Sequence, residues 1–169
     1  TKAQEEAMLG FVRAGKGIAL MHAALDANYG SKGYREMVGG GQFQSHPWTQ
    51  SVRMDVEEPE NPAVGHLGDG FWMRDEIYVL DQNPRWNSHV LLSLDMPSVG
   101  VPVGSPDATR DDFPISWVRR YGEGRVFATK LGHFGDVWRK PDYLRHLVLG
   151  MRQAAGGLRR RFAAAQVCA

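Results

Sequence analysis

The chain has 169 residues, of which 43% are hydrophobic and 23% are charged, a composition that predicts one globular domain with a core of its own. Lys and Arg number 20 against 19 Asp and Glu, and this net charge of +1 excludes a strong attraction to nucleic acid or membrane surfaces. The single cysteine, Cys168, excludes an internal disulfide, and no run of about 18 apolar residues predicts a membrane-spanning helix.

The first part of the chain predicts a helix, a strand and a second short helix. Apolar residues at helical spacing, with acidic residues early and Arg13 late, predict a helix over residues 2–14. The run "IALM", residues 18–21, predicts a short buried strand, which we expect to be parallel because helices flank it. Residues 31–40, "SKGYREMVGG", predict one or two further helical turns.

The middle of the chain predicts three strands. Val, Met and Val alternate with charges in residues 51–58, which predicts a half-buried strand that ends at a proline-rich turn. "DEIYVL" (75–80) and "HVLLSLDM" (89–96) predict two more strands. Residues 97–114 are rich in Pro, Gly, Ser and Asp and predict one long surface loop.

The last part of the chain predicts a hairpin and a helix. One strand is expected to end at Tyr121 and the next to begin at Arg125, with the "GEG" turn between them. Residues 141–155 predict a helix with Pro141 in its first turn and Gly156 just past its end.

This order of elements predicts an α/β fold with a mostly parallel sheet. The chain opens on a helix, whereas a parallel α/β domain ordinarily opens on a strand, so we expect one β–α unit to be missing upstream. Residues 1–158 are expected to form the domain, and the basic residues 159–169 a tail or the start of a linker.

Two histidines follow predicted strands and are the first candidates for a functional site. His22 ends the strand 18–21 and His133 ends "RVFATKLG", and the carboxyl ends of parallel strands are where α/β proteins bind ligands. Each histidine alone is better read as a hydrogen-bonded structural residue, whereas for the pair at one edge of the sheet the structural and functional readings are nearly equal. Two carboxylates could join them: Asp26, four residues past His22, and Glu76 at the edge of an apolar strand. Asp75 is interpreted as a turn residue.

The chemistry of these histidines has two readings. A neutral imidazole binds a divalent metal, and His22 and His133 with Asp26 or Glu76 would form a nitrogen–oxygen set suited to zinc or manganese. No HxH or HExxH spacing singles out a metal site. An imidazole with one carboxylate partner also serves as a general base near neutral pH, and the sequence leaves both readings open.

Further candidates surround this predicted site. His46 precedes Pro47, which holds its backbone extended, and it either lines the pocket or stabilises a loop. Four aromatic residues are candidates for stacking on sugar rings, with burial in the core as the alternative: Tyr29, Trp48, Tyr78 and Trp138. The remaining histidines are interpreted as surface or structural residues: His66, His89 and His146.

Two glycine-rich stretches are excluded as nucleotide-binding loops. "GEGR" (122–125) lacks the third glycine and the strand-to-helix setting of a dinucleotide loop. "GGGQF" (39–43) lacks the lysine of a phosphate loop.

Four segments in order, "GKGIALMHAA", "GYREMVGGGQFQSHP", "DEIYVL" and "WVRRYGEGRVFATKLGHFGDVW", resemble the ThuA-like family, named for trehalose utilisation. The resemblance covers roughly residues 3–155 and implies the fold of class I glutamine amidotransferases, a flavodoxin-like three-layer sandwich whose first strand and helix are absent here. In such an amidotransferase, the strand matching "IALM" leads into a tight elbow with a catalytic cysteine. Here His22 holds that position, between Met21 and the small Ala23, so no glutaminase activity is expected.

The resemblance also implies a function in bacterial sugar catabolism, on trehalose-type disaccharides or their keto derivatives, by elimination, isomerisation or hydrolysis. The residues that we then expect to be catalytic are His22, His133 and Glu76, with both histidines as the candidate metal ligands. The residues expected to contact substrate are Asp26, Tyr29, His46, Trp48 and Tyr78. The alternative is a non-catalytic sugar-binding or structural module, as a homo-oligomer or a subunit of a larger assembly. The sequence does not choose between cytoplasm and periplasm.

Overall fold

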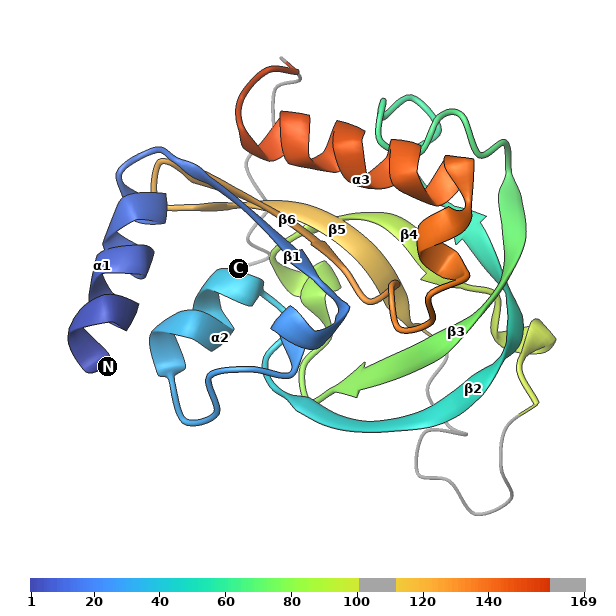
Figure 1. Cartoon of the computed structure of the whole chain (residues 1–169), viewed down its shortest axis with the longest axis horizontal. Helices are drawn as coiled ribbons and strands as arrows, with labels where there is room; N and C mark the ends of the chain where they lie inside the picture. Colours follow the sequence, from blue (N-terminus) through green and yellow to red (C-terminus); the bar gives the residue numbers. More distant parts are fainter. Residues whose placement is uncertain (101–111, 159–169) are drawn as a thin grey trace.

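The computed structural model describes residues 1–100 and 112–158, and these residues contain one six-stranded sheet with three α-helices (Figure 1). The strands are β1 (Gly17–Met21), β2 (Phe43–Val56), β3 (Gly70–Leu80), β4 (His89–Leu94), β5 (Pro114–Tyr121) and β6 (Gly124–Thr129). The α-helices are α1 (Lys2–Arg13), α2 (Lys32–Val38) and α3 (Pro141–Ala154). The predicted tail 159–169 and most of the predicted loop 97–114 lie outside the described residues.

The sheet is mixed and mostly antiparallel, with the strand order β1-β6-β5-β4-β2-β3. Only β1 and β6 pair in parallel, and the other four pairs of neighbours, β6–β5, β5–β4, β4–β2 and β2–β3, are antiparallel. The sheet curls into a half-barrel (Figure 1). The expected mostly parallel, flavodoxin-like or glutamine amidotransferase-like sandwich is therefore wrong.

The connections between the strands explain the antiparallel arrangement. A parallel pair needs a crossover of about a dozen residues or more, usually a helix, whereas a tight turn joins antiparallel strands. β5 and β6 are joined by two residues, Gly122 and Glu123, and no helix interrupts the segment between β2 and β3. β1 alone among the strands has α-helices on both sides of it in the chain, and it forms the one parallel pair.

The helices cover both faces of the β1–β6–β5 part of the sheet. Along β6, Phe127 belongs to the core cluster beneath α3, whereas Val126 and Ala128 belong to the cluster beneath α1 and α2. This alternation is what a strand buried on both faces requires, since successive side chains point to opposite sides. In α1, the cap residue Thr1 and Gln4 form a capping box that fixes the start of the helix. No helix among the described residues is long and apolar enough to cross a membrane.

A long β2–β3 ribbon brings residues from the middle of the chain to the end of β1. The predicted strand 51–58 overlaps the second half of β2, which begins earlier, at Phe43, and ends at Val56. The predicted strand 75–80 is the second half of β3, which begins at Gly70. The register of β2 shifts between Ser45 and Trp48, a bulge that accommodates Pro47, which has no N–H to donate to a ladder. Bulges of this kind redirect nearby side chains, and His46 lies within it.

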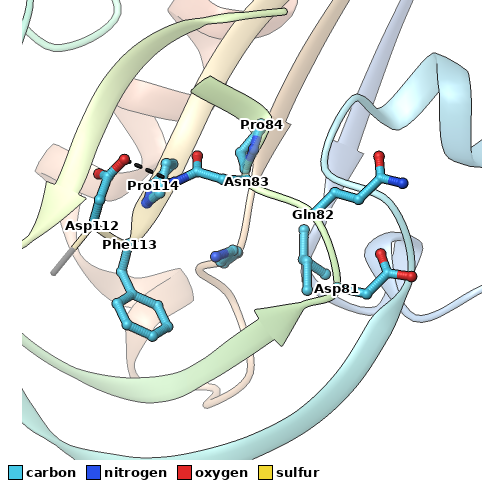
Figure 2. A pocket seen from close by; sticks show the side chains of 9 residues that line it. Asp81, Gln82, Asn83, Pro84, Asp112, Phe113 and Pro114 are labelled. Carbon is cyan, nitrogen blue, oxygen red and sulfur yellow. Dashed lines mark hydrogen bonds between the residues drawn. The ribbon is translucent and has the colours of Figure 1, made fainter. Parts of the chain in front are cut away.

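A cavity of about 390 Å³ opens where the segment after β3 meets the start of β5 (Figure 2). Asp81, Asn83, Asp112 and Phe113 are among the residues that line it. None of the candidate catalytic residues lines this cavity, although Lys130, at the end of β6, does.

Candidate functional site

His22 lies at the end of β1, as the first residue of a short 3₁₀ helix, η1 (His22–Leu25). Its φ is +40°, a left-handed conformation that side chains other than glycine adopt uncommonly and that is concentrated at functional sites. The side chain is 9% exposed, and its Nδ1 lies 2.7 Å from the carbonyl oxygen of Lys130. Because a carbonyl only accepts hydrogen bonds, Nδ1 carries the proton, and in the neutral ring Nε2 keeps its lone pair.

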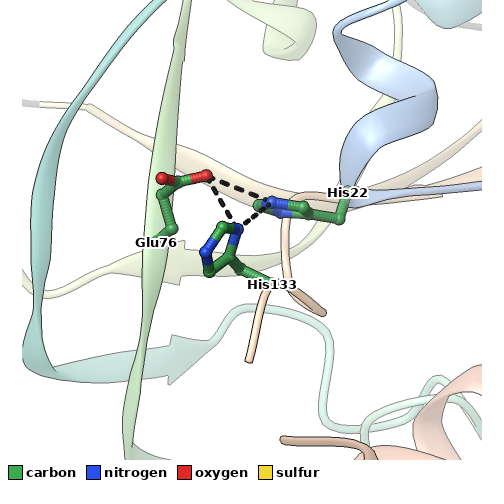
Figure 3. A group of neighbouring side chains, drawn as sticks. All are labelled: His22, Glu76 and His133. Carbon is green, nitrogen blue, oxygen red and sulfur yellow. Dashed lines mark hydrogen bonds and ion pairs between the residues drawn. The ribbon is translucent and has the colours of Figure 1, made fainter. Parts of the chain in front are cut away.

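The Nε2 atom of His22 meets His133 and Glu76 in a tight triangle, which we call the His–Glu–His cluster (Figure 3). Nε2 of His22 lies 3.2 Å from Oε2 of Glu76 and 3.1 Å from Nδ1 of His133. The third side, from His133 Nδ1 to Glu76 Oε2, is 3.1 Å. The three residues come from the end of β1, the loop after β6 and the middle of β3, so the curled ribbon is what completes the cluster.

The cluster has the donor set and spacing of a divalent metal site. Two imidazole nitrogens and one carboxylate oxygen form a common catalytic zinc set. Donors that bind one zinc tetrahedrally at about 2.0–2.1 Å lie about 3.3–3.4 Å apart, and the separations here are 3.1–3.2 Å. The Lys130 carbonyl behind His22 is the outer-shell partner that metal-binding histidines ordinarily have. Protons shared between imidazole and carboxylate would also satisfy these atoms, so both readings from the sequence fit the geometry.

Glu76 also contacts a third histidine. Its second oxygen, Oε1, lies 3.2 Å from Nδ1 of His46, so that the carboxylate bridges His46 and the cluster. A carboxylate partner at Nδ1 holds the proton there and leaves Nε2 of His46 as the basic nitrogen. The His46 side chain is 55% exposed, more than the 41% of His133, whereas Glu76 is 10% exposed.

Asp75 fixes the loop that carries His133. Its carboxylate is fully buried and accepts hydrogen bonds from the backbone N–H groups of Gly132 at 2.7 Å, His133 at 3.1 Å and Phe134 at 3.4 Å. The interpretation of Asp75 as a turn residue is wrong, because it lies inside β3. The charged pair "DE" before an apolar strand was the available signal, and sequence reasoning used only its second member.

Tyr78 lies against His22, with the two ring centroids 4.2 Å apart. Burial raises the pKa of its hydroxyl to about 12, and the negative charges of Glu76 and Asp26 add to this rise. Tyr78 therefore keeps its proton at neutral pH. Asp26 itself accepts a hydrogen bond from the hydroxyl of Tyr29, whose side chain is exposed.

Two tryptophans proposed for sugar stacking differ in position. Trp48 is 1% exposed and packs edge-on against Phe113 in the core, so the structure does not bring it to the cluster. Trp138 is partly exposed, and its Nε1 donates a hydrogen bond to the carbonyl of Gly132, next to His133. The other three histidines contact residues outside the cluster: His66 the carbonyl of Asp142, His89 the carboxylate of Glu58, and His146 the carbonyl of Ala63.

The ThuA family model, described as trehalose utilisation, matches residues 1–154. A ThuA-like protein from Bacteroides uniformis is similar in structure, with 26% identity and a TM-score of 0.75 over 91% of this chain and 64% of that chain. The chain thus spans less than two thirds of that relative. A ThuA-like protein from Parabacteroides merdae, 17% identical over 99% of this chain and 71% of that chain, shows the same fold with a TM-score of 0.73. A cytoplasmic protein from Salmonella typhimurium, 14% identical over 89% of this chain and 59% of that chain, has a TM-score of 0.60. No curated protein matches the chain.

Proposed function

The chain belongs to the ThuA family of trehalose utilisation, and from this membership we propose that it is an enzyme that acts on a keto derivative of a trehalose-type disaccharide at the His–Glu–His cluster. The observation that carries the proposal is the convergence of three donor atoms within 3.2 Å of one another, one of them in a buried imidazole whose proton position is fixed by a carbonyl. Because a histidine and not a cysteine follows β1, glutaminase activity is not part of the proposal.

In this proposal His22, Glu76 and His133 hold a divalent metal, zinc or manganese. When bound, such an ion would polarise the keto oxygen of the sugar and increase the acidity of the neighbouring C–H group. The support is the donor set, its spacing and the carbonyl behind His22.

His46 is the proposed base. Its Nε2 removes the proton from the carbon beside the keto group, because Nδ1 is engaged with Glu76 Oε1 at 3.2 Å. The electron pair of the broken C–H bond forms a double bond to the next carbon of the ring, and the glycosidic C–O bond on that carbon breaks. His46 then donates the proton to the departing glycosidic oxygen, which completes a β-elimination and leaves His46 neutral again.

Tyr78 and Asp26 are proposed to orient the sugar. The Tyr78 hydroxyl is neutral at physiological pH because its pKa is about 12, so it donates a hydrogen bond to a sugar oxygen. The carboxylate of Asp26 accepts hydrogen bonds, as the Tyr29 contact already shows, and is suited to a sugar hydroxyl.

The first experiment is elemental mass spectrometry of the purified protein and of the H22A and H133A variants. We expect close to one zinc or manganese ion per chain in the wild type and loss of most of it in each variant. The control is H89A, because His89 pairs with Glu58 at 3.5 Å and lies outside the cluster; it should keep the metal.

Turnover of keto-trehalose, followed by the release of a free sugar, separates the enzyme from the alternative, a non-catalytic sugar-binding module. Equal metal content in all four proteins would contradict the metal site. Unchanged turnover in H22A and H133A would contradict the role of the cluster altogether. Sugar binding without turnover in the metal-loaded wild type would favour the module.

A further inference from the structure

We propose that Trp86 and the segment Asp81–Asn83 form a second binding site, for a neutral sugar ring, separate from the His–Glu–His cluster. Trp86 is the last residue of the 3₁₀ helix η2 (Pro84–Trp86), and its side chain is 85% exposed. An exposed aromatic ring beside a polar cavity is suited to stack on the apolar face of a ligand.

The turn that carries Trp86 is held rigidly. The Arg85 guanidinium binds Glu57 through two bonds of 2.6 and 2.7 Å, and it also binds Asp112 at 2.7 Å. Asn83 caps the turn by accepting from Arg85 N–H and donates to Asp112 at 2.8 Å. These charge-assisted bonds to the residue after β2 and to the segment before β5 hold the turn in place before any ligand arrives, which lowers the entropic cost of binding.

The glycine stretch Gly39–Gly41, which matched no nucleotide loop, packs beside this turn, and Gly39 lines the smaller of the two cavities described below. A Cβ atom at Gly40 would overlap the side chain of Leu80, and one at Gly41 would overlap the carboxylate of Asp81. Gly41 also has a φ of +78°, which favours glycine. The stretch therefore brings its backbone into close contact with the segment after β3, and the N–H of Gln42 donates to Asp81 at 2.7 Å.

Two cavities meet at this segment. One has a volume of about 390 Å³ and the other about 340 Å³, and Asp81, Gln82 and Asn83 line both of them. Trp86 lines the smaller cavity (the larger is shown in Figure 2). Both volumes lie within the range of about 300–1,000 Å³ that is typical of small-molecule sites.

The lining selects a neutral, hydroxyl-rich ligand rather than an ion. The carboxylate of Asp81 lies 3.9 Å from the Arg35 guanidinium. Arg85 binds both Glu57 and Asp112, and the charge of Lys130 also acts on Asp112, so two cations balance these two carboxylates. Their oxygens still accept hydrogen bonds from hydroxyl groups. The exposed side-chain amide of Gln82 has no hydrogen bond to another described residue, and it offers both a donor and an acceptor.

The second site is distinct from the cluster but close to it. Glu76 and Leu80 lie on the same face of β3, four residues apart, which corresponds to about 13 Å of strand. Lys130 connects the two regions, because its carbonyl binds His22 and its side chain lines the larger cavity. The proposal shares its ligand class with the proposed function, but it depends on different residues.

The test is trehalose binding, measured by saturation-transfer NMR and by tryptophan fluorescence titration, with the wild type, W86A and W72A. Trp72, in β3, is 61% exposed and does not line either cavity, so W72A is the matched control. We expect W86A to bind trehalose at least about tenfold more weakly and W72A to bind it as the wild type does. Both substitutions are on the surface, so folding should be preserved.

The two proposals fail separately. The double variant H22A/H133A should lose metal and turnover yet still bind trehalose through Trp86, whereas W86A should keep its metal. The second site is overturned if the wild type does not bind trehalose, or if W86A binds it with unchanged affinity. It is also overturned if the wild type shows concentration-dependent self-association that W86A alone abolishes, since Trp86 would then be a protein contact.

Discussion

At the scale of single residues, Asp75 shows how a buried side chain controls a site that it does not enter. It accepts three backbone hydrogen bonds from the loop 132–134, and that loop carries His133. Hydrogen bonds to an ionised carboxylate are about twice as strong as those between neutral groups. Because Asp75 is fully buried, no water can take its place if these hydrogen bonds are lost. The position of the His133 ring therefore depends on Asp75.

We predict that D75N lowers the free energy of unfolding by about 2–4 kcal/mol and weakens metal binding by about 10–100-fold. An amide retains one acceptor oxygen but turns an NH₂ group toward backbone N–H donors. Urea unfolding and a metal titration of the folded protein measure the two effects. D69N, at a side chain that is 95% exposed, is the control and should change neither. Unchanged metal affinity in D75N would show that the hydrogen bonds between Asp75 and the loop 132–134 only stabilise the fold.

Several site residues were predictable from the sequence because of where strands end. His22 and His133 follow β1 and β6, and this is the one parallel pair, so the rule about the carboxyl ends of parallel strands applied there. Glu76 was found from its place in an apolar run. Asp75 was missed because a charge before a strand is ordinarily a turn residue. For Trp48, no neighbouring residue in the sequence indicates a position in the core.

At the scale of elements, two helical glycines have opposite surroundings. Gly150 in α3 faces Phe127 of β6, and a Cβ atom there would overlap the aromatic ring. Gly10 in α1 is exposed, and a Cβ atom there would have no neighbour within 4 Å. The first glycine lets α3 approach the sheet, whereas the second only lowers helix propensity.

We predict that G10A raises the free energy of unfolding by about 0.4–1 kcal/mol, because alanine restricts the unfolded chain and favours the helix. G150A should lower it by about 1–3 kcal/mol, because overpacking outweighs the same propensity gain. Urea unfolding midpoints of the two variants measure this difference. If G150A proved as stable as the wild type, α3 would be able to shift away from β6 at little cost.

The helices were more predictable than the strands. The helices expected at 2–14 and 141–155 are observed at Lys2–Arg13 and Pro141–Ala154, since their periodicity and end residues agree. The first half of β2 was missed because Pro47 and the polar residues around it are typical of a loop. A bulge admits this proline into a strand, and no local pattern in the sequence announces the bulge.

At the scale of the whole molecule, the sheet topology was the part that the sequence did not provide. Alternation of helices and strands at both ends of the chain favoured a parallel sheet, and the family resemblance reinforced this view. The middle of the chain, from β2 to β5, contains no α-helix among its described residues and so lacks helical crossovers. Strand pairing between distant segments depends on these connections more than on the composition of each strand.

The packing of α3 against the sheet buries a histidine, His146, whose protonation makes the stability of the protein depend on pH. His146 of α3 is completely buried, with Nδ1 2.9 Å from the carbonyl of Ala63 and Nε2 3.2 Å from the hydroxyl of Ser116. Its ring also lies edge-on to Phe127. Burial lowers the pKa of His146 from 6.5 to about 4, and the nearby His66 also lowers it.

We predict that this histidine destabilises the protein in mild acid. In the unfolded chain His146 takes up a proton near pH 6.5, whereas in the folded protein it does so only near pH 4. The unfolded state therefore binds more protons between these values, and the free energy of unfolding falls as the pH drops through them, by about 3 kcal/mol in total. Urea unfolding from pH 7.5 to 4 measures the slope, and H146Q should have a shallower one even if it is less stable at pH 7.5. If NMR of the folded protein showed His146 titrating near pH 6.5, the buried ring would not be the source of the acid sensitivity.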